Sequence, residues 1–176
     1  MELQRILDKN STLYQRALNL YESAFPFLER RDKDELTRVF NNKNFHFDII
    51  LDGEIFVGIM FYWERDNYIF LEHFAVLEGL RNKGFGARAL ELLKQKNKKI
   101  ILEIEPPLSN LTQRRYAFYT RNGFVMNPYY HIQAKYHIGD EDLELKILSY
   151  PRILDEREYT DFYKYMIREM SVKTTR

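Results

Sequence analysis

The sequence predicts an α/β or α+β protein built on a mixed sheet, and three observations lead to this prediction. The chain has 176 residues, of which 45% are hydrophobic, enough for one domain, residues 1–176, with a core of ordinary size. Two β-rich runs meet at Asp52-Gly53, which is a strong hairpin signal. Predicted elements then follow in the order helices, antiparallel hairpins, helix, strand, helix and further strands, which is typical of a mixed sheet with helices.

The first half of the chain changes from helical to extended periodicity near residue 45. Ser11 or Thr12 can cap a helix whose apolar residues recur at helical spacing, and the Pro26 region breaks or bends it. The run FHFDIILDGEIFVGIMFYWE is rich in β-branched and aromatic residues, and a polar turn separates it from a third such run. The expected elements are a helix from about residue 12 to the Pro26 region, a helix at 32–40, two strands within 45–64 and a strand at 68–77.

The second half alternates helices with shorter strands. Pro106-Pro107 stops the apolar strand KIILEIE, and Asn122-Gly123 is a C-cap pair that ends the helix before it. The segment LELKILS alternates cleanly, as a half-buried strand does. The expected elements are a helix at 84–96, a strand at 99–105, a helix at 112–121, weak strands at 124–127 and 131–136, a strand at 143–149 and a helix at 155–172.

Charge, cysteine content and hydropathy narrow the classes of function. The chain has 27 Lys and Arg and 26 Asp and Glu, a net charge of +1, so no overall field favours nucleic acid or an acidic membrane. It has no cysteine, which excludes disulfides, thiolate metal sites and a cysteine nucleophile. The sequence lacks the long apolar run of a membrane span or a signal peptide, so we expect a cytoplasmic protein that binds neither nucleic acid nor a membrane.

The stretch RNKGFG, residues 81–86, has the makings of a phosphate-binding loop. Such a loop needs glycines, consecutive backbone N–H groups and a helix N-terminus, and this stretch offers all three. It lacks the GK[ST] of a Walker-type loop and the third glycine of a dinucleotide-binding fingerprint. Gly84 and Gly86 on their own are also compatible with a loop that simply ends before a helix, so the surrounding elements must decide.

Those surroundings are specific. The strand FLEHFAVL precedes RNKGFG, the strand ILEIE follows its helix, and the helix RRYAFYTRNGF comes next. Together they resemble the GNAT superfamily of acyl-CoA-dependent N-acyltransferases, over about Phe45 to Val125. RNKGFG stands where the family has an Arg/Gln-x-x-Gly-x-Gly/Ala loop, and FYTRNGF stands where it has an aromatic-Tyr helix that ends in Gly-Phe. The resemblance implies a GNAT-like fold, with a central mixed, mostly antiparallel sheet of six to seven strands flanked by helices.

The resemblance also implies acetyl-CoA as co-substrate. The loop would wrap the pyrophosphate, since a Cβ at Gly84 or Gly86 would push the phosphates away. The main chain of the preceding strand would pair with the pantetheine arm, and one of its amides would face the thioester oxygen. Thr112 stands where relatives often carry an asparagine, with Asn110 as the alternative. The residues expected at the coenzyme are Phe74, Ala75, Val76, Arg81, Asn82, Lys83, Gly84, Phe85, Gly86, Ala87, Thr112, Arg115 and Tyr119.

The family reaction is direct attack of a primary amine on an acyl thioester, and the resemblance suggests residues for it. Tyr119 lies four residues before Gly123, where relatives often place a tyrosine near the coenzyme sulfur. A phenol can protonate or hydrogen-bond the departing thiolate. Glu72 and Glu103 stand where different relatives place a base, although a structural ion pair or an exposed strand edge explains either carboxylate equally well. The histidines show no metal-like spacing with carboxylates, so we expect no metal.

The sequence does not name the acceptor. Small-molecule and peptide amines both remain open as partners, and a homodimer, common in the superfamily, would be compatible. A non-catalytic acyl-CoA-binding sensor or assembly protein is the alternative to an N-acetyltransferase. Aromatic residues near the expected acceptor side could line a pocket, although helix packing explains them nearly as well: Phe25, Phe27, Tyr129, Tyr130 and Tyr136. Three carboxylates could hold an ammonium there: Glu22, Glu29 and Asp34.

Overall fold

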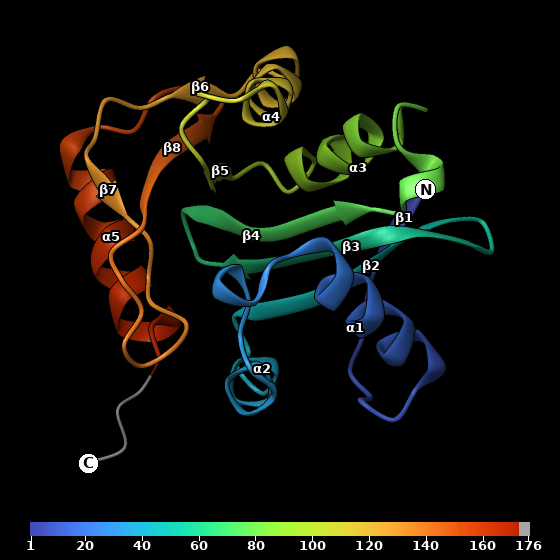
Figure 1. Cartoon of the computed structure of the whole chain (residues 1–176). Coiled ribbons are helices and arrows are strands. Elements are labelled where there is room, and N and C mark those ends of the chain that lie inside the picture. The colour runs from blue at the N-terminus through green and yellow to red at the C-terminus, as the bar shows by residue number, and fades with distance from the viewer. Residues whose placement is uncertain (173–176) are drawn as a thin grey trace. The chain divides into compact units, whose positions relative to one another are not determined.

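A computed structural model of the chain describes residues 1–172, which contain eight β-strands and five α-helices (Figure 1). The mixed α/β class is confirmed, with one strand more than the upper limit expected from the sequence. The chain forms two compact units that interleave in sequence. The first unit comprises Met1–Phe27 and Phe40–Ile100, and the second comprises Leu28–Val39 and the chain from Ile101 onward. The expectation of a single domain stays a prediction.

The first unit is built on four antiparallel strands in the order β1-β2-β3-β4. β1 (Glu2–Arg5), β2 (Phe45–Asp52), β3 (Ile55–Glu64) and β4 (Tyr68–Val76) follow one another in sequence apart from the helices inserted after β1. The predicted hairpin at Asp52-Gly53 is confirmed: Asp52 pairs with Ile55, and Gly53 has φ +61°. A positive φ at the first residue of a two-residue turn is the reason for a glycine there.

Two helices cover the strands of the first unit. α1 (Thr12–Ala24) packs on β3 and β4, and α3 (Phe85–Lys94) packs on β1 and β4. Figure 1 shows these strands between the two helices, and the short 3-10 helix η2 (Glu78–Leu80) precedes α3. Ser11 caps α1 by accepting a hydrogen bond from the Tyr14 amide, as the sequence predicts.

Aromatic side chains from α1 and the strands form the core under α1. The Tyr14 ring stacks on Phe47 at 5.0 Å, and Phe47 stacks on Phe61 at 4.0 Å. Tyr21 continues this cluster, with its ring 5.3 Å from Phe61 and 4.8 Å from His73. His73 is therefore a core residue, buried edge-on among aromatic rings.

In the second unit, one strand pairs antiparallel with two short strands. β8 (Glu144–Tyr150) pairs with β6 (Val125–Met126) and with β7 (His131–Ile132). Its helices are α4 (Asn110–Arg121) and α5 (Glu156–Met170), and it also holds all but the last residue of α2 (Lys33–Phe40). β5 (Lys99–Ile104) and the 3-10 helix η1 (Phe27–Glu29) each run across a boundary between the units.

Buried polar side chains hold the second unit together. The Asn127 carbonyl accepts from the Leu154 amide at 2.7 Å, and its amide donates to the Ser149 hydroxyl at 2.8 Å, which ties β8 to the start of α5. Arg31 donates to the Met170 carbonyl at 2.6 Å, at the C-terminus of α5. A cation suits this position because the last carbonyls of a helix lack partners within the helix.

Several elements of the structure differ from those that the sequence predicts. β1 was not expected, because ELQR has neither β-branched nor aromatic residues; it forms by pairing with β2, some 45 residues away. The strand expected at 131–136 shrinks to two residues. Of the helices in residues 1–172, none combines the length and the apolar content needed to span a bilayer.

Candidate functional site

The N-terminus of α3, in the first unit, has a left-handed N-cap residue and no side-chain cap among the described residues. Gly84 is the N-cap residue with φ +80°, and Asn82 also adopts a left-handed conformation with φ +60°. Within the described chain no side chain caps this helix, so the first-turn amides of Phe85, Gly86 and Ala87 are left for another acceptor. Successive amides at a helix N-terminus favour negative charge because the helix dipole adds to their partial positive charge.

The two cations of the loop, Arg81 and Lys83, donate hydrogen bonds to nearby backbone carbonyls. Arg81 Nε donates to the Val76 carbonyl at 3.1 Å, and Lys83 Nζ donates to the Gly79 carbonyl at 2.8 Å. Both bonds are exposed, so each side chain can also turn toward an anion at little cost. In the structure both side chains brace the loop that connects β4 to α3.

The end of β4, expected to pair with the pantetheine arm, is set by its close contact with β3. Gly58 pairs with Val76, and a Cβ on Gly58 would lie 2.1 Å from the Ala75 carbonyl oxygen. That distance is far inside van der Waals contact, so only glycine permits β4 to approach β3 this closely. Phe74, Ala75 and Val76 therefore owe their backbone position to Gly58, a residue that the sequence analysis did not single out.

Glu72, one of the two candidate bases, lies in a β-bulge. Phe61 pairs with His73 while Tyr62 pairs with Leu71, so the Cα register between β3 and β4 skips Glu72. Its Oε2 accepts a hydrogen bond from the indole nitrogen of Trp63 at 2.9 Å. Simple alternation of side chains along β4 does not hold through a bulge. The bulge explains how a carboxylate is tolerated in an apolar strand, and it leaves the catalytic role a prediction.

Tyr119, the candidate proton donor, projects from α4 in the second unit. It is 9% exposed, and its ring packs edge-on against Phe118 and Phe124. Burial raises the pKa of Tyr119 to about 12, with a lowering effect from Arg115 and a smaller raising effect from Glu105. The phenol is thus protonated at neutral pH, the state a proton donor needs. Among residues 1–172 its hydroxyl makes none of the described hydrogen bonds, so it is available to a ligand.

Arg115 lies one turn before Tyr119 on α4 and forms an ion pair with Glu105, the residue that follows β5. Glu29 belongs to the same electrostatic group: burial raises its pKa, Glu105 raises it further, and Arg115 lowers it. Arg115 is expected at the coenzyme; in this structure it pairs with Glu105, and the contact with the coenzyme stays a prediction. Arg115 and Glu105 thus act on the pKa of Tyr119, and both also act on the pKa of Glu29.

Thr112 is occupied within α4 itself. Its hydroxyl accepts from the Ser109 amide at 2.9 Å, while the Ser109 hydroxyl accepts from the Thr112 amide at 3.2 Å. This capping box satisfies two amides at the start of α4. The expected contact of Thr112 with pantetheine would have to compete with the cap, and it stays a prediction.

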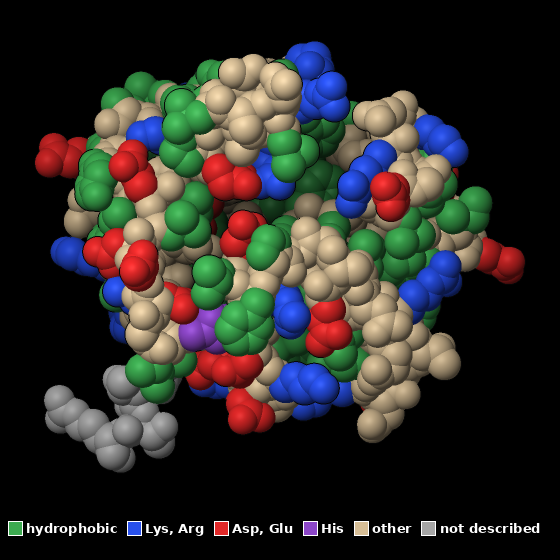
Figure 2. Space-filling view, viewed as in Figure 1, with side chains coloured by type: hydrophobic (Ala, Val, Ile, Leu, Met, Phe, Trp, Pro, Cys, Tyr) green, Lys and Arg blue, Asp and Glu red, His purple; other side chains and the backbone are tan. Residues whose placement is uncertain are grey.

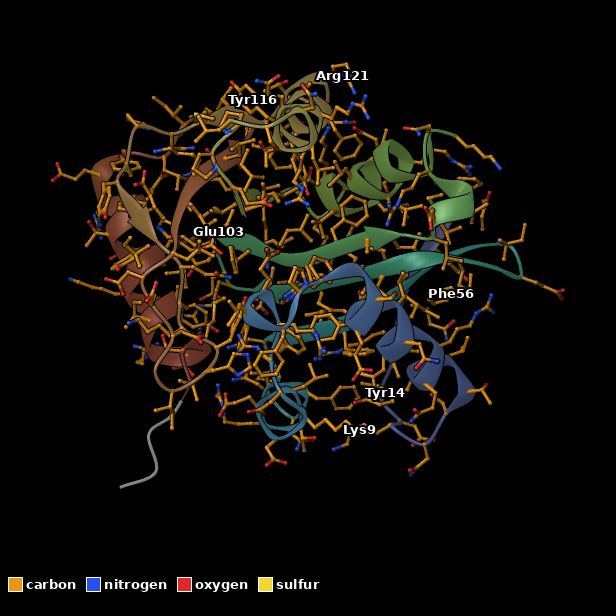
Figure 3. All side chains as sticks on the ribbon, viewed as in Figure 1. Lys9, Tyr14, Phe56, Glu103, Tyr116 and Arg121 are labelled. Carbon is orange, nitrogen blue, oxygen red and sulfur yellow. The ribbon has the colours of Figure 1, made fainter. Side chains whose placement is uncertain are left out.

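Glu103, the other candidate base, is engaged by a histidine that the sequence analysis passed over. Its Oε1 lies 2.5 Å from Nε2 of His131 on β7, whose side chain is fully buried. Nδ1 of His131 lies 3.1 Å from the hydroxyl of Tyr159 on α5. Figure 3 labels Glu103 on β5, together with Tyr116 and Arg121, which mark the course of α4. The 28 residues between Glu103 and His131 left no local signal of this contact.

The structure thus gathers the predicted site residues into two sets. The first unit holds the β4 segment, the loop and the start of α3, together with Glu72. The second unit holds Glu103, Thr112, Arg115 and Tyr119. Among the described residues no three His, Asp or Glu side chains group as metal ligands would. Lys and Arg side chains intermix with Asp and Glu over the face seen in Figure 2.

Known proteins share this combination of elements and motifs. The model of the acetyltransferase (GNAT) family matches residues 13–124, more than half of the chain. A solved structure from Bacteroides thetaiotaomicron, named as an acetyltransferase of the GNAT family, is 31% identical and superposes with a TM-score of 0.90, covering 98% of this chain and 100% of its own. The chain belongs to the GNAT family. The resemblance carried by RNKGFG and FYTRNGF is confirmed.

Two further proteins are similar to this GNAT protein, one in sequence and one in fold. YjbC of Bacillus subtilis (strain 168), which carries the name of an acetyltransferase, is 31% identical over 112 residues, 61% of this chain and 57% of YjbC. The match therefore spans little more than half of that relative. An aminoglycoside 6'-N-acetyltransferase solved with coenzyme A shares the fold, at 16% identity and a TM-score of 0.60 over 85% of this chain and 96% of its own.

Proposed function

We propose that this GNAT protein is an N-acetyltransferase that transfers an acetyl group from acetyl-CoA to a primary amine. The observation that carries the proposal is the N-terminus of α3, where Gly84 and Asn82 are left-handed and the first-turn amides lack a side-chain cap. A diphosphate is an anion of the kind such amides bind. Family membership and a structural neighbour solved with coenzyme A support coenzyme A as its source.

In this proposal the first unit binds the coenzyme. The amides of Gly84 to Ala87 donate to the pyrophosphate oxygens, and Arg81 and Lys83 add positive charge. The backbone of Phe74 to Val76 pairs with the pantetheine arm. An amide of that segment donates to the thioester oxygen and stabilises the oxyanion as it forms.

The chemical step forms a nitrogen–carbon bond and breaks the carbon–sulfur bond. The amine attacks the thioester carbonyl and loses a proton, and the tetrahedral intermediate expels coenzyme A as a thiolate. Tyr119 donates a hydrogen bond or its proton to that thiolate, since its hydroxyl is protonated and makes none of the hydrogen bonds described within residues 1–172. Transfer from a phenol whose pKa is about 12 to a thiolate is uphill, so the hydrogen bond itself carries much of the stabilisation.

The acceptor in this proposal is an amine of a small molecule or a peptide, which is protonated and positively charged in water. Glu105 acts on the pKa of Tyr119, and Glu29 is a second carboxylate that interacts with Glu105 and Arg115. Carboxylates beside a substrate site favour an ammonium over a carboxylate substrate. The amine must then lose its proton before it attacks.

Turnover tests the proposal directly. Release of free coenzyme A thiol is followed with acetyl-CoA and a panel of primary amines, including small polyamines, amino sugars, free lysine and peptide N-termini. Amine-dependent release, with the acetylated amine detected by mass, is the expected result. Acetyl-CoA binding without turnover of any amine in the panel would favour a non-catalytic acyl-CoA-binding protein instead.

A further inference from the structure

A buried hydrogen-bonded chain in the second unit joins β5, β7 and α5. Glu103 Oε1 lies 2.5 Å from His131 Nε2, and His131 Nδ1 lies 3.1 Å from the Tyr159 hydroxyl. That hydroxyl also donates to the carbonyl oxygen of Tyr130 at 3.0 Å. None of the roles given above to Tyr119, the loop or the acceptor carboxylates uses His131 or Tyr159.

Tyr159 is the most exposed side chain of this network. Tyr159 is half-buried, the side chain of Glu103 is 9% exposed, and that of His131 is 0% exposed. A fully buried imidazole costs free energy unless its ring nitrogens have partners, and both nitrogens of His131 have one. Because Tyr159 is the most exposed of the three, its hydroxyl is the route by which a proton reaches His131.

The same heavy-atom positions accommodate two protonation states of His131. In the neutral state, Nε2–H donates to Glu103 and the Tyr159 hydroxyl donates to Nδ1. In the protonated state, Nδ1–H donates to the Tyr159 oxygen, and the hydroxyl turns to the Tyr130 carbonyl. The hydroxyl can serve both states because its two acceptors lie at 3.1 and 3.0 Å. The states differ by one proton and the rotation of one O–H bond.

The groups around His131 suit this exchange. The Glu103 carboxylate accepts from Nε2 in both states and stabilises the imidazolium of the second. From α5 the rings of Phe162 and Tyr163 lie 6.1 and 5.6 Å from the imidazole, and on β8 its register partner is Leu145. Within residues 1–172, the titratable groups described against His131 are therefore Glu103, Tyr159 and Tyr163.

We propose that Glu103, His131 and Tyr159 form a relay that accepts the proton lost by the acceptor amine, an inference that rests on the proposed acetyltransferase function. The amine N–H bond breaks and its proton binds the Tyr159 oxygen, while the Tyr159 hydroxyl proton passes to His131 Nδ1. The nitrogen–carbon bond forms as this happens. After the carbon–sulfur bond breaks, His131 returns the proton to solvent through Tyr159. Tyr159 touches the amine in this scheme, and His131 and Glu103 are positioning residues that act through it.

A pair of matched variants tests the relay. Tyr159→Phe keeps the ring that stacks on Tyr129 at 4.0 Å and removes the hydroxyl. It should lower kcat/KM for the amine roughly 10²-fold near neutral pH, and the loss should shrink as pH approaches the pKa of the free amine, which then needs no base. Tyr163→Phe, one turn along α5, removes a hydroxyl outside the network and should leave the pH profile unchanged. If Tyr159→Phe had the same pH profile as the wild type, the relay would be overturned. Amine-dependent turnover by the wild-type protein would still support the transferase.

A second measurement reads the relay without activity. Histidine side-chain ¹⁵N NMR of the unliganded protein should show a proton on Nε2 of His131, which donates to Glu103, and an Nδ1 that accepts from the Tyr159 hydroxyl. Tyr159→Phe should change the Nδ1 signal, and Tyr163→Phe should not. An Nδ1 signal that is the same in Tyr159→Phe as in the wild type would overturn the relay whether or not the enzyme turns over. Absence of turnover in the wild type would instead overturn the proposed function.

Discussion

The Tyr62 hydroxyl donates a hydrogen bond to Asp48 Oδ2 at 3.0 Å, while Oδ1 of the same carboxylate is buried without a hydrogen-bond partner in residues 1–172. Asp48 lies on β2 and is 3% exposed. Burial raises its pKa to about 6, against lowering effects from Tyr62, Arg5 and Lys96. A carboxylate of this kind is a cost to the fold at neutral pH that a neutral side chain would not carry.

Asp48→Asn should therefore stabilise the protein at pH 7. The folded pKa of about 6 lies above the ordinary aspartate pKa of 3.8, so the unfolded chain ionises more readily and the carboxylate disfavours folding above pH 6. Two pKa units correspond to at most about 3 kcal/mol, and a gain of roughly 1–3 kcal/mol in the free energy of unfolding is expected. Asparagine keeps an oxygen for Tyr62. Urea unfolding at pH 7 measures the change, and a loss of stability would contradict this reading of Asp48.

Asp48→Asn should also make the free energy of unfolding more sensitive to acid, because Asp48 then no longer offsets the effect of His46. Burial lowers the pKa of His46 to about 4, so its neutral form favours folding above the unfolded value of 6.5, and that contribution is lost as pH falls toward 4. In the wild type the protonation of Asp48 near pH 6 works in the opposite direction. Unfolding free energies from pH 7 to pH 4 should therefore fall more steeply in Asp48→Asn than in the wild type. Parallel curves would show that the two groups do not offset one another.

Gly58→Ala should harm both the fold and coenzyme binding. The added Cβ would lie 2.1 Å from the Ala75 carbonyl, so β4 must shift at the segment expected to hold pantetheine. Overpacking of this kind costs about 1–3 kcal/mol, and acetyl-CoA affinity should fall with it. Gly79→Ala is the control, because nothing lies within 4 Å of its Cβ position and its φ is not in the left-handed region. Thermal unfolding and calorimetry on both variants give the comparison; equal behaviour would refute the constraint.

Arg31→Ala should unfold the second unit more easily. The guanidinium donates to the Met170 carbonyl at 2.6 Å, lies 4.8 Å from the Tyr136 ring centroid, and is 2% exposed as a residue. Losing this buried contact should cost about 2–4 kcal/mol. Arg168→Ala, which removes an exposed ion pair with Glu169, should cost less than about 1 kcal/mol. Chemical denaturation distinguishes the two, and a small effect at Arg31 would contradict its role at the end of α5.

Tyr119→Phe should lower turnover and leave acetyl-CoA binding nearly intact. The ring contacts with Phe118 and Phe124 remain, so the melting temperature should not change, while kcat should fall roughly 10²-fold. Tyr116→Phe on the same helix is the control and should behave as the wild type. Steady-state kinetics and coenzyme titration are both needed. Loss of binding in Tyr119→Phe would show that the hydroxyl holds the coenzyme and does not assist the leaving thiolate.

Features with a local sequence signal were predictable here. Asp52-Gly53 marks a turn, Ser11 a helix cap, and RNKGFG a loop that opens a helix, because each depends on residues within a few positions. Asn122-Gly123 likewise ends α4, and Gly123 has φ +82°. These motifs were enough to indicate the family and the coenzyme loop.

Features made by distant residues were not predictable. β1 exists through its pairing with β2, and the bulge at Glu72 depends on the register between β3 and β4. Glu103 was considered as a single carboxylate, and its contact with His131 appears only when β5 and β7 meet. Tyr159 lies within the helix predicted at 155–172, where its hydroxyl gives no local signal of a partner.

Calorimetric titration of acetyl-CoA into the wild type, Gly84→Glu and Gly139→Glu tests the coenzyme site most directly. Gly84 and Gly139 both have positive φ and open space at the Cβ position, so the two substitutions carry similar strain, but only the first puts a carboxylate at the start of α3. Micromolar binding by the wild type and by Gly139→Glu, lost in Gly84→Glu, is the expected result. A folded wild type that does not bind acetyl-CoA, or equal binding by all three proteins, would contradict a coenzyme site at this helix.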